Sequence, residues 1–133
     1  MKKILLSTLI LIGLASCSGS NDIIPDDTSG DINGVWILTA EYDDIIRQGL
    51  SECQLNENIA FEGNSVVMVK TDETGNSGCT ISTVEGTFSK TGTSLSIQTA
   101  NENKQYKIKE LTKTKLHLFP SNSTKSYVYE RAE

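Results

Sequence analysis

The chain has 133 residues, enough for one domain, and 37% of them are hydrophobic, 22% charged and 6% aromatic. One His, one Trp and three Cys argue against a zinc cluster and a histidine-based catalytic site, and no apolar run is long enough to span a membrane. The formal net charge of −5 argues against nucleic-acid binding, which needs a basic surface. These counts favour an exported β domain with a modest core.

Residues 1–16 have the features of a secretory signal peptide. Lys2 and Lys3 form a short positive region, and residues 4–14 are almost wholly apolar. A stretch of about 11–13 apolar residues spans roughly 17–20 Å as a helix, whereas a membrane core is ~30 Å thick. We therefore predict a cleaved signal peptide rather than a transmembrane helix.

The signal peptide is followed by Leu14-Ala15-Ser16-Cys17, which resembles the lipobox of bacterial lipoproteins. The resemblance implies that Cys17 receives a diacylglyceryl group, that cleavage occurs before it and that its new amino group is acylated. Several acyl chains give a durable membrane anchor. The expected location is therefore the bacterial cell envelope, at the outer membrane. The sequence does not decide between its periplasmic and surface faces. The alternative is an ordinary secretory signal with a chance Cys.

Residues 17–33 are predicted to be the lipidated Cys and a flexible acidic tether. The segment is small, polar and acidic, contains Pro25 and has no hydrophobic periodicity. Asp31, Asn33 and Gly34 form a fragment of a calcium-loop pattern, but the closing carboxylate is missing, so we expect no metal site. Without residues 1–16, Lys and Arg fall from 12 to 10 against 17 Asp and Glu, a net charge of −7.

With Cys17 lipidated, Cys53 and Cys79 are left as an even pair. In an oxidising compartment such a pair indicates one disulfide, which the chain-entropy relation values at roughly 3.5 kcal/mol. The alternative is two free thiols. Neither Cys lies in a Cys-x-x-Cys motif or among basic residues, so a reactive thiol is not expected.

From residue 34 onward, short apolar alternations recur between turn signals, a pattern typical of all-β proteins. We predict strands at 35–42, 58–62, 65–71, 81–89, 94–99, 105–111, 115–119 and 125–131. Residues 43–57 form a mixed excursion with a helical turn around 44–48, and residues 72–80 form a loop. Eight sequential strands with short connections predict a small antiparallel up-and-down barrel over residues 34–133.

The alternation within each strand predicts which side chains point into the barrel. Residues 66–69 and 127–129 are apolar on both faces and leave their orientation open. The predicted interior side chains are Trp36, Leu38, Ala40, Ile59, Phe61, Val84, Phe88, Leu95, Ile97, Tyr106, Ile108, Leu116 and Leu118.

The order of these motifs resembles the small lipocalin-like domain of bacterial lipoproteins. The motifs are Gly34-Val35-Trp36 at the start of the first strand, Gly86-Thr87-Phe88, Leu95-Ser96-Ile97, and Ile108 through Leu111-Thr112 to Leu116 and Leu118. The resemblance implies an eight-stranded barrel closed at one end by Trp36. The sequence departs from the family at Phe88, where Trp is commoner. It is also short for this family, and the short strands imply a small cavity.

An enzyme is not expected, and no cofactor is predicted. His117 is the one His and is predicted to face solvent beside Lys115, and no Gly-x-Ser-x-Gly motif is present. The carboxylate pairs Asp43-Asp44 and Asp72-Glu73 lie in or beside loops. The sequence therefore predicts binding rather than catalysis.

Two binding functions fit the sequence. The first is non-enzymatic binding of a small hydrophobic ligand inside the barrel, which would need a void of several hundred Å³. The second is a side-chain-filled barrel that acts as a protein- or envelope-interaction module, with no partner identified. Its basic face would be a stripe of lysines: Lys104, Lys107, Lys109, Lys113 and Lys115.

Overall fold

The computed structural model describes residues 27–73 and 78–132. The signal peptide, Cys17 and most of the predicted tether lie outside these residues. The described strands are β1 (Gly34–Asp43), β2 (Ile46–Gln48), β3 (Asn58–Glu62), β4 (Ser65–Glu73), β5 (Cys79–Thr91), β6 (Ser94–Thr99), β7 (Asn103–Leu111), β8 (Lys115–Pro120) and β9 (Lys125–Arg131). The helical element among them is the single 3-10 turn η1 (Gln54–Asn56).

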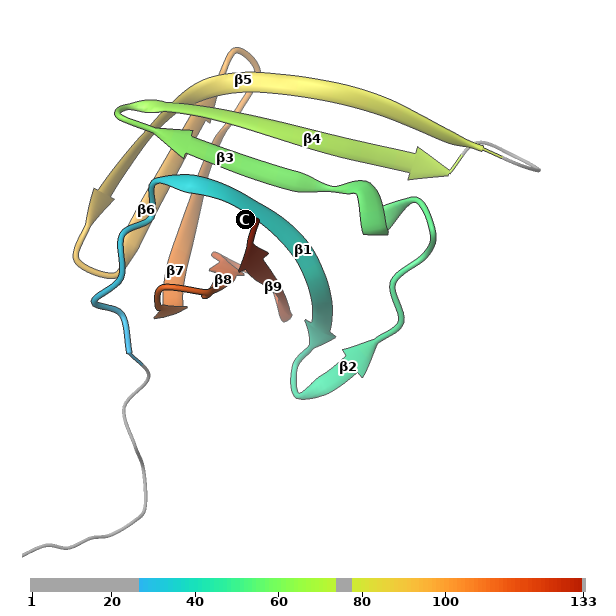
Figure 1. Ribbon diagram of the computed structural model, residues 1–133, viewed down its shortest axis with the longest axis horizontal. Helices are drawn as coiled ribbons and strands as arrows, with labels where there is room; N and C mark the ends of the chain where they lie inside the picture. Colours follow the sequence, from blue (N-terminus) through green and yellow to red (C-terminus); the bar gives the residue numbers. More distant parts are fainter. Residues whose placement is uncertain (1–26, 74–77, 133) are drawn as a thin grey trace, which may run out of the picture.

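The strands form one antiparallel barrel (Figure 1). β1 and β3 to β9 pair in chain order, and β9 returns to pair with β1 from Trp36↔Arg131 to Asp43↔Lys125. β2 is an additional short strand beside the second half of β1. The predicted all-β, eight-stranded antiparallel barrel is therefore confirmed, with one strand added.

Two local predictions are wrong. The expected helical turn at 44–48 is a tight β-hairpin, in which Asp44 adopts a left-handed φ of 60° and leads into β2. The helical turn of this excursion lies later, at η1. The predicted loop at 72–80 is shorter than expected, because β4 and β5 pair without interruption from Ser65↔Thr87 to Glu73↔Cys79.

The turns after β3, β5 and β7 lie at one end of the barrel. Residues 27–33 pack across this end and close it, so we call them the strap and this end the closed end. The Gly30 amide donates to the Leu111 carbonyl, and the Leu111 amide donates to the Asp27 carbonyl, both at 2.8 Å. Ile32 is buried in the main core. The tether was predicted to extend to residue 33, but residues 27–33 belong to the barrel.

A β-bulge in β1 shifts the register against β9 between Leu38 and Ala40. Leu38 lies opposite the inward-facing Tyr129, whereas Ala40 lies opposite Val128, which points outward. The predicted interior position of Ala40 is therefore wrong, although Ala40 is buried. Beyond the bulge, it is Glu41 that shares the inner side with Tyr127.

Candidate functional site

Apolar side chains fill most of the barrel interior. Seven of the predicted interior residues are at most 2% exposed and belong to one cluster: Trp36, Phe61, Leu95, Ile97, Ile108, Leu116 and Leu118. Phe88 and Tyr106 are half-buried and pack against this cluster, and Leu38 is buried beside it. The two strands with ambiguous faces contribute Val66, Met68 and Tyr129 to the interior.

Trp36 lies at the closed end, as the resemblance implied. Its indole Nε1 donates to the Ile32 carbonyl of the strap at 2.8 Å, and the Arg131 guanidinium lies 4.2 Å from the indole centroid. Arg131 in turn donates to the carbonyls of Asp31 and Asn33. These contacts hold the strap over the core, so Trp36 has a structural role.

The opposite end, the mouth, contains a cavity of about 30 Å³. Its walls include the apolar side chains of Ile59, Met68 and Leu118 and the rings of Tyr106 and Tyr129. Burial raises the pKa of Tyr106 to about 12 and raises that of Tyr129 further. The space suits about two water molecules, whereas pockets for small ligands measure roughly 300–1,000 Å³.

The segment around η1 bridges β1 and β4 at the mouth. Gln54 Nε2 donates to Glu41 Oε1 at 2.9 Å, and Thr71 Oγ1 donates to the Cys53 carbonyl at 2.8 Å. The predicted Cys53–Cys79 disulfide is present, with a Cα–Cα distance of 5.5 Å. The excursion is therefore tied to the barrel at several points.

A larger hollow lies on the outer face of β1, β7, β8 and β9, and we name it the wall groove. Its volume is about 510 Å³. Its floor contains the small buried side chains of Ala40, Ser126 and Val128. The β1–β2 hairpin, through Ile45 and Arg47, borders one side. Because the wall groove lies on the outer face of the sheet, it is separate from the side-chain-filled interior.

Aromatic rings line the wall groove. The His117 ring centroid lies 6.1 Å from that of Tyr42 and 4.7 Å from that of Phe119, and Lys109 Nζ lies 5.7 Å from the Phe119 centroid. His117 Nε2 is 2.9 Å from the buried Ser126 hydroxyl. His117 therefore lies on the outer face as predicted, but it is half-buried and hydrogen-bonded rather than fully solvated.

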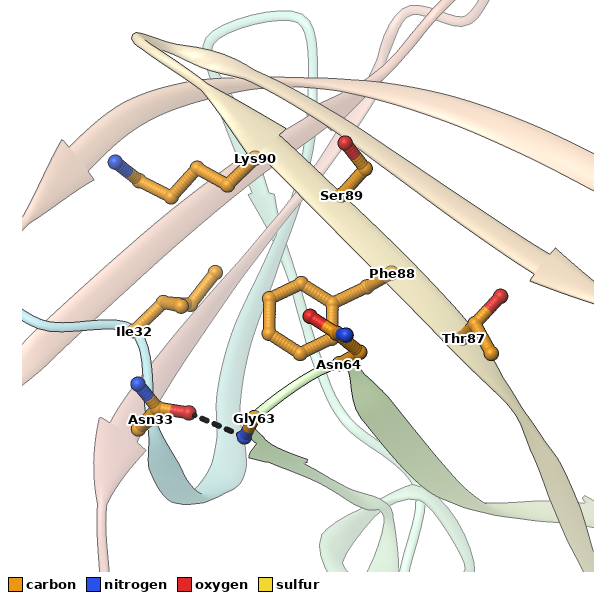
Figure 2. A pocket seen from close by; sticks show the side chains of 8 residues that line it. All are labelled: Ile32, Asn33, Gly63, Asn64, Thr87, Phe88, Ser89 and Lys90. Carbon is orange, nitrogen blue, oxygen red and sulfur yellow. Dashed lines mark hydrogen bonds between the residues drawn. The ribbon is translucent and has the colours of Figure 1, made fainter.

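A second surface hollow of about 610 Å³ lies beside the strap at the closed end (Figure 2). The Phe88 ring lies at its centre, near Ile32 and Asn64, and packs edge-on against Phe61 at 4.8 Å. Asn33 Oδ1 accepts a hydrogen bond from the Gly63 amide across it. These contacts stabilise the closed end, where the rings pack against the barrel itself.

The acidic side chains at the end of β1 contact residues at the start of β9. Within residues 27–73 and 78–132, no group of three or more His, Cys, Asp or Glu is placed to hold a metal ion. Asp43 accepts a hydrogen bond from the Thr124 hydroxyl, and Glu41 pairs with Lys125 at 3.4 Å. No helix in this part of the chain is both long and apolar enough to cross a membrane.

The lysines of the predicted basic stripe are all exposed, but they do not share one face. Lys104 pairs with the inward-facing Ile97 and lies on the inner side of the sheet near the mouth. Lys107 pairs with Ser94 and faces outward. A bulge between Ile108 and Glu110 separates the later positions. The prediction that these five lysines form one stripe on the outer face is therefore wrong for Lys104.

The sequence and the fold were compared with known proteins. A family model described as "Lipocalin-like domain" matches residues 32–118. Comparison with curated protein sequences finds no match. A lipocalin-like protein from Bacteroides uniformis ATCC 8492 is similar in structure, with a TM-score of 0.59 and 18% identity over 77% of this chain and 100% of that one. An uncharacterized protein from Bacteroides eggerthii DSM 20697 gives a TM-score of 0.58 and 16% identity, with the same coverage.

Proposed function

This chain belongs to the family of lipocalin-like domains, and from that membership we propose that it is a non-enzymatic, lipid-anchored binding module of the bacterial cell envelope. Domains of this fold typically bind rather than catalyse. In the proposal, the barrel acts as a filled scaffold, and the wall groove contacts the partner. Cys17 carries the lipid, and the envelope, at the outer membrane, is the compartment.

The observation that carries this proposal is the contrast between two volumes. The mouth cavity measures about 30 Å³ and the wall groove about 510 Å³. A void of the first size holds water rather than an organic ligand, and the second lies within the range of ligand pockets. The space for a ligand therefore lies outside the barrel.

The chemistry of the wall groove supports recognition of a ring-containing or mixed polar and apolar partner group. Tyr42, His117 and Phe119 offer ring faces, and Thr39, Arg47 and Glu130 offer polar groups at the margin. Rings flanked by a few polar groups are typical of binding sites.

A second candidate is transport of a small hydrophobic ligand inside the barrel, which the lipocalin-like fold suggests. The apolar walls at Ile59, Met68 and Leu118 favour it. This function requires the mouth to widen by several hundred Å³. For the mouth to widen, the η1 segment would have to move away from the barrel, and the Cys53–Cys79 disulfide restrains that movement.

Native mass spectrometry of the oxidised protein from residue 18 onward tests the choice between these functions. The protein is analysed as purified and after incubation with palmitic acid and with haem. The proposal expects a bare mass in every case. A bound mass that Leu118→Trp abolishes, in a variant that still folds, would establish the carrier and overturn the filled-scaffold proposal.

The wall groove is tested with the same protein by nuclear magnetic resonance. Indole and methyl-glucoside serve as probes of ring stacking. Shifts should concentrate at His117, Phe119 and Tyr42 and should be lost in Phe119→Ala. The matched control is Val35→Ala, an outer-face residue on the same barrel that is 45% exposed. Shifts centred on the mouth would contradict the assignment.

The anchor is tested separately in the full chain. Labelled palmitate should enter the wild-type protein and not the Cys17→Ala variant, while Cys53→Ala/Cys79→Ala should still be labelled. Labelling that persists in Cys17→Ala would contradict the lipobox assignment.

A further inference from the structure

One strand leaves part of its edge without a partner. β5 pairs with β4 along Cys79–Thr87, but it pairs with β6 only from Gly86 to Thr91. Within the part of the chain that the structure describes, no strand lies beside β5 on its other side from Cys79 to Glu85. Figure 1 shows this half of β5 extending with β4 beyond the other strands. We name residues 79–85 the free edge.

The free edge lacks most of the features that usually block strand addition. Its sequence is CTISTVE, which contains no Lys and no Pro and is rich in β-branched residues. Its pairing with β4 runs without a bulge. Ile81 is 60% exposed at its centre. A long and regular edge that is rich in β-branched residues is a template for pairing with another strand.

The neighbouring edge of the same hairpin is protected, which makes the contrast informative. On β4, the Thr71 amide donates to Glu57 Oε2 at 3.2 Å, and the Thr71 hydroxyl donates to the Cys53 carbonyl. The η1 segment therefore covers the β4 edge. The fold protects one edge of the hairpin and leaves the other open.

We propose that the free edge pairs with the free edge of a second copy of this chain, in antiparallel register about a two-fold axis at Ser82. This register uses the whole edge. It places Ile81 opposite Thr83 of the second copy, and Thr80 opposite Val84. Pairs of β-branched residues directly opposite each other stabilise antiparallel sheets.

Charge also fits this register. Glu85 is the single charged residue of the free edge, and the two-fold register places it opposite Cys79 rather than opposite its own copy. Like charges directly opposite would oppose pairing. Among the described residues, each chain offers one free edge of this length, so the contact is isologous and closes at a dimer. This inference holds with or without a ligand in either hollow.

Sedimentation velocity of the oxidised protein from residue 18 onward tests the proposal. That protein retains the whole core, because every buried hydrophobic residue described lies between Ile32 and Val128. We expect a dimer whose fraction rises with concentration. Ile81→Lys/Thr83→Lys places Lys opposite Lys at two positions and should give a monomer.

A charge-swapped partner tests the register itself. Ile81→Glu/Thr83→Glu should also be monomeric, and an equimolar mixture of the Lys and Glu variants should recover the dimer. The matched control is Val35→Lys/Ile37→Lys, which alters two exposed residues on β1, a strand already paired on both sides. This control should remain dimeric.

Three results would overturn the proposal. The first is a wild-type monomer at millimolar concentration, which would assign the edge to a strand from another protein. The second is a dimer that persists in the Ile81→Lys/Thr83→Lys variant, and the third is a mixture of the Lys and Glu variants that stays monomeric.

Hydrogen exchange of the wild type adds a measurement that needs no variant. The amides of residues 79–85 must gain protection as the protein is concentrated, and an absence of gain counts against the pair.

Discussion

The Arg131 guanidinium lies over the Trp36 indole, with 4.2 Å between the guanidinium carbon and the ring centroid, at the point where the first and last strands of the barrel meet. The same guanidinium group donates to the carbonyls of Lys113, Asn33 and Asp31. One side chain thus connects the strap, the turn after β7 and the core.

Arg131→Ala should lower the free energy of unfolding by about 2 kcal/mol, because it removes a cation–π contact and charge-assisted hydrogen bonds. Chemical denaturation followed by Trp36 fluorescence measures the change. Lys113→Ala is the control, since the Lys113 carbonyl that accepts from Arg131 is unaffected. Equal stability of Arg131→Ala and wild type would show that the buried Ile32 and the hydrogen bonds to Leu111 hold the strap without Arg131.

Gly34→Ala should destabilise the barrel by about 1–3 kcal/mol. Gly34 has a φ of +134°, which L side chains rarely adopt, and an added Cβ would clash with Arg131 Nη1. Gly49→Ala is the matched control, because nothing lies within 4 Å of its Cβ position. Thermal unfolding of both variants measures the difference, and a Gly34→Ala variant as stable as Gly49→Ala would refute the reason given.

Cys53→Ala/Cys79→Ala should lower the free energy of unfolding by roughly 3.5 kcal/mol, because the cross-link restricts the unfolded chain. The folded variant should gain hydrogen exchange first in η1 and in the projecting ends of β4 and β5. The closed end should keep its protection. Loss of protection at Trp36 and Ile32 before η1 would contradict this order.

Acid should loosen the strap. Hydrogen bonds from Ser29 lower the pKa of Asp27, and hydrogen bonds from the Asn33 amide groups lower that of Asp31, both from an ordinary value of 3.8. A carboxylate with a lowered pKa stabilises the fold above its ordinary pKa, and the contribution is lost as the pH falls through the lowered value. Nuclear magnetic resonance of the Gly30 and Asn33 amides should report this release.

Asp31→Asn should remove the acid dependence at Asn33, and Asp72→Asn, on the projecting hairpin, is the control for loss of one surface carboxylate. Gly30 and Asn33 signals that move together with those of the central strands would indicate global unfolding instead.

Alkali should destabilise the mouth. Burial raises the pKa of Tyr106 from 10.0 to about 12 and raises the pKa of Tyr129 as well. A raised tyrosine pKa means that the neutral form is favoured in the folded state, so this stabilisation is complete below pH 10 and is lost as the pH rises toward 12. Tyrosinate absorption should be delayed for both residues, and Tyr106→Phe should remove the part of the delayed change that occurs near pH 12. A delayed step of unchanged size in that variant would assign it to another tyrosine.

Period-two alternation predicted the strands and most of the interior, because inward positions such as Leu95, Ile97, Leu116 and Leu118 alternate with polar residues. Ile32 was missed because it is a single apolar residue in an acidic segment, and its burial depends on core residues from distant strands such as Leu111. The bulge that moves Ala40 to the outer wall leaves no signal in the alternation.

The wall groove could not be predicted either. Tyr42, His117 and Ser126 come from three strands, and only the closure of β1 against β9 brings them together. The free edge depends on the unequal lengths of β5 and β6, which neither segment reveals alone. Local pattern thus predicts faces, whereas hollows and edges follow from how the strands are staggered.

The strap joins the barrel at the closed end, where the Asp27 carbonyl accepts from the Leu111 amide. The N-terminal end of the described chain and the mouth therefore lie at opposite poles of the barrel. β5 runs from the mouth toward the closed end, and a two-fold pair reverses its direction. In the proposed dimer the straps of the two copies would thus lie at opposite poles of the pair.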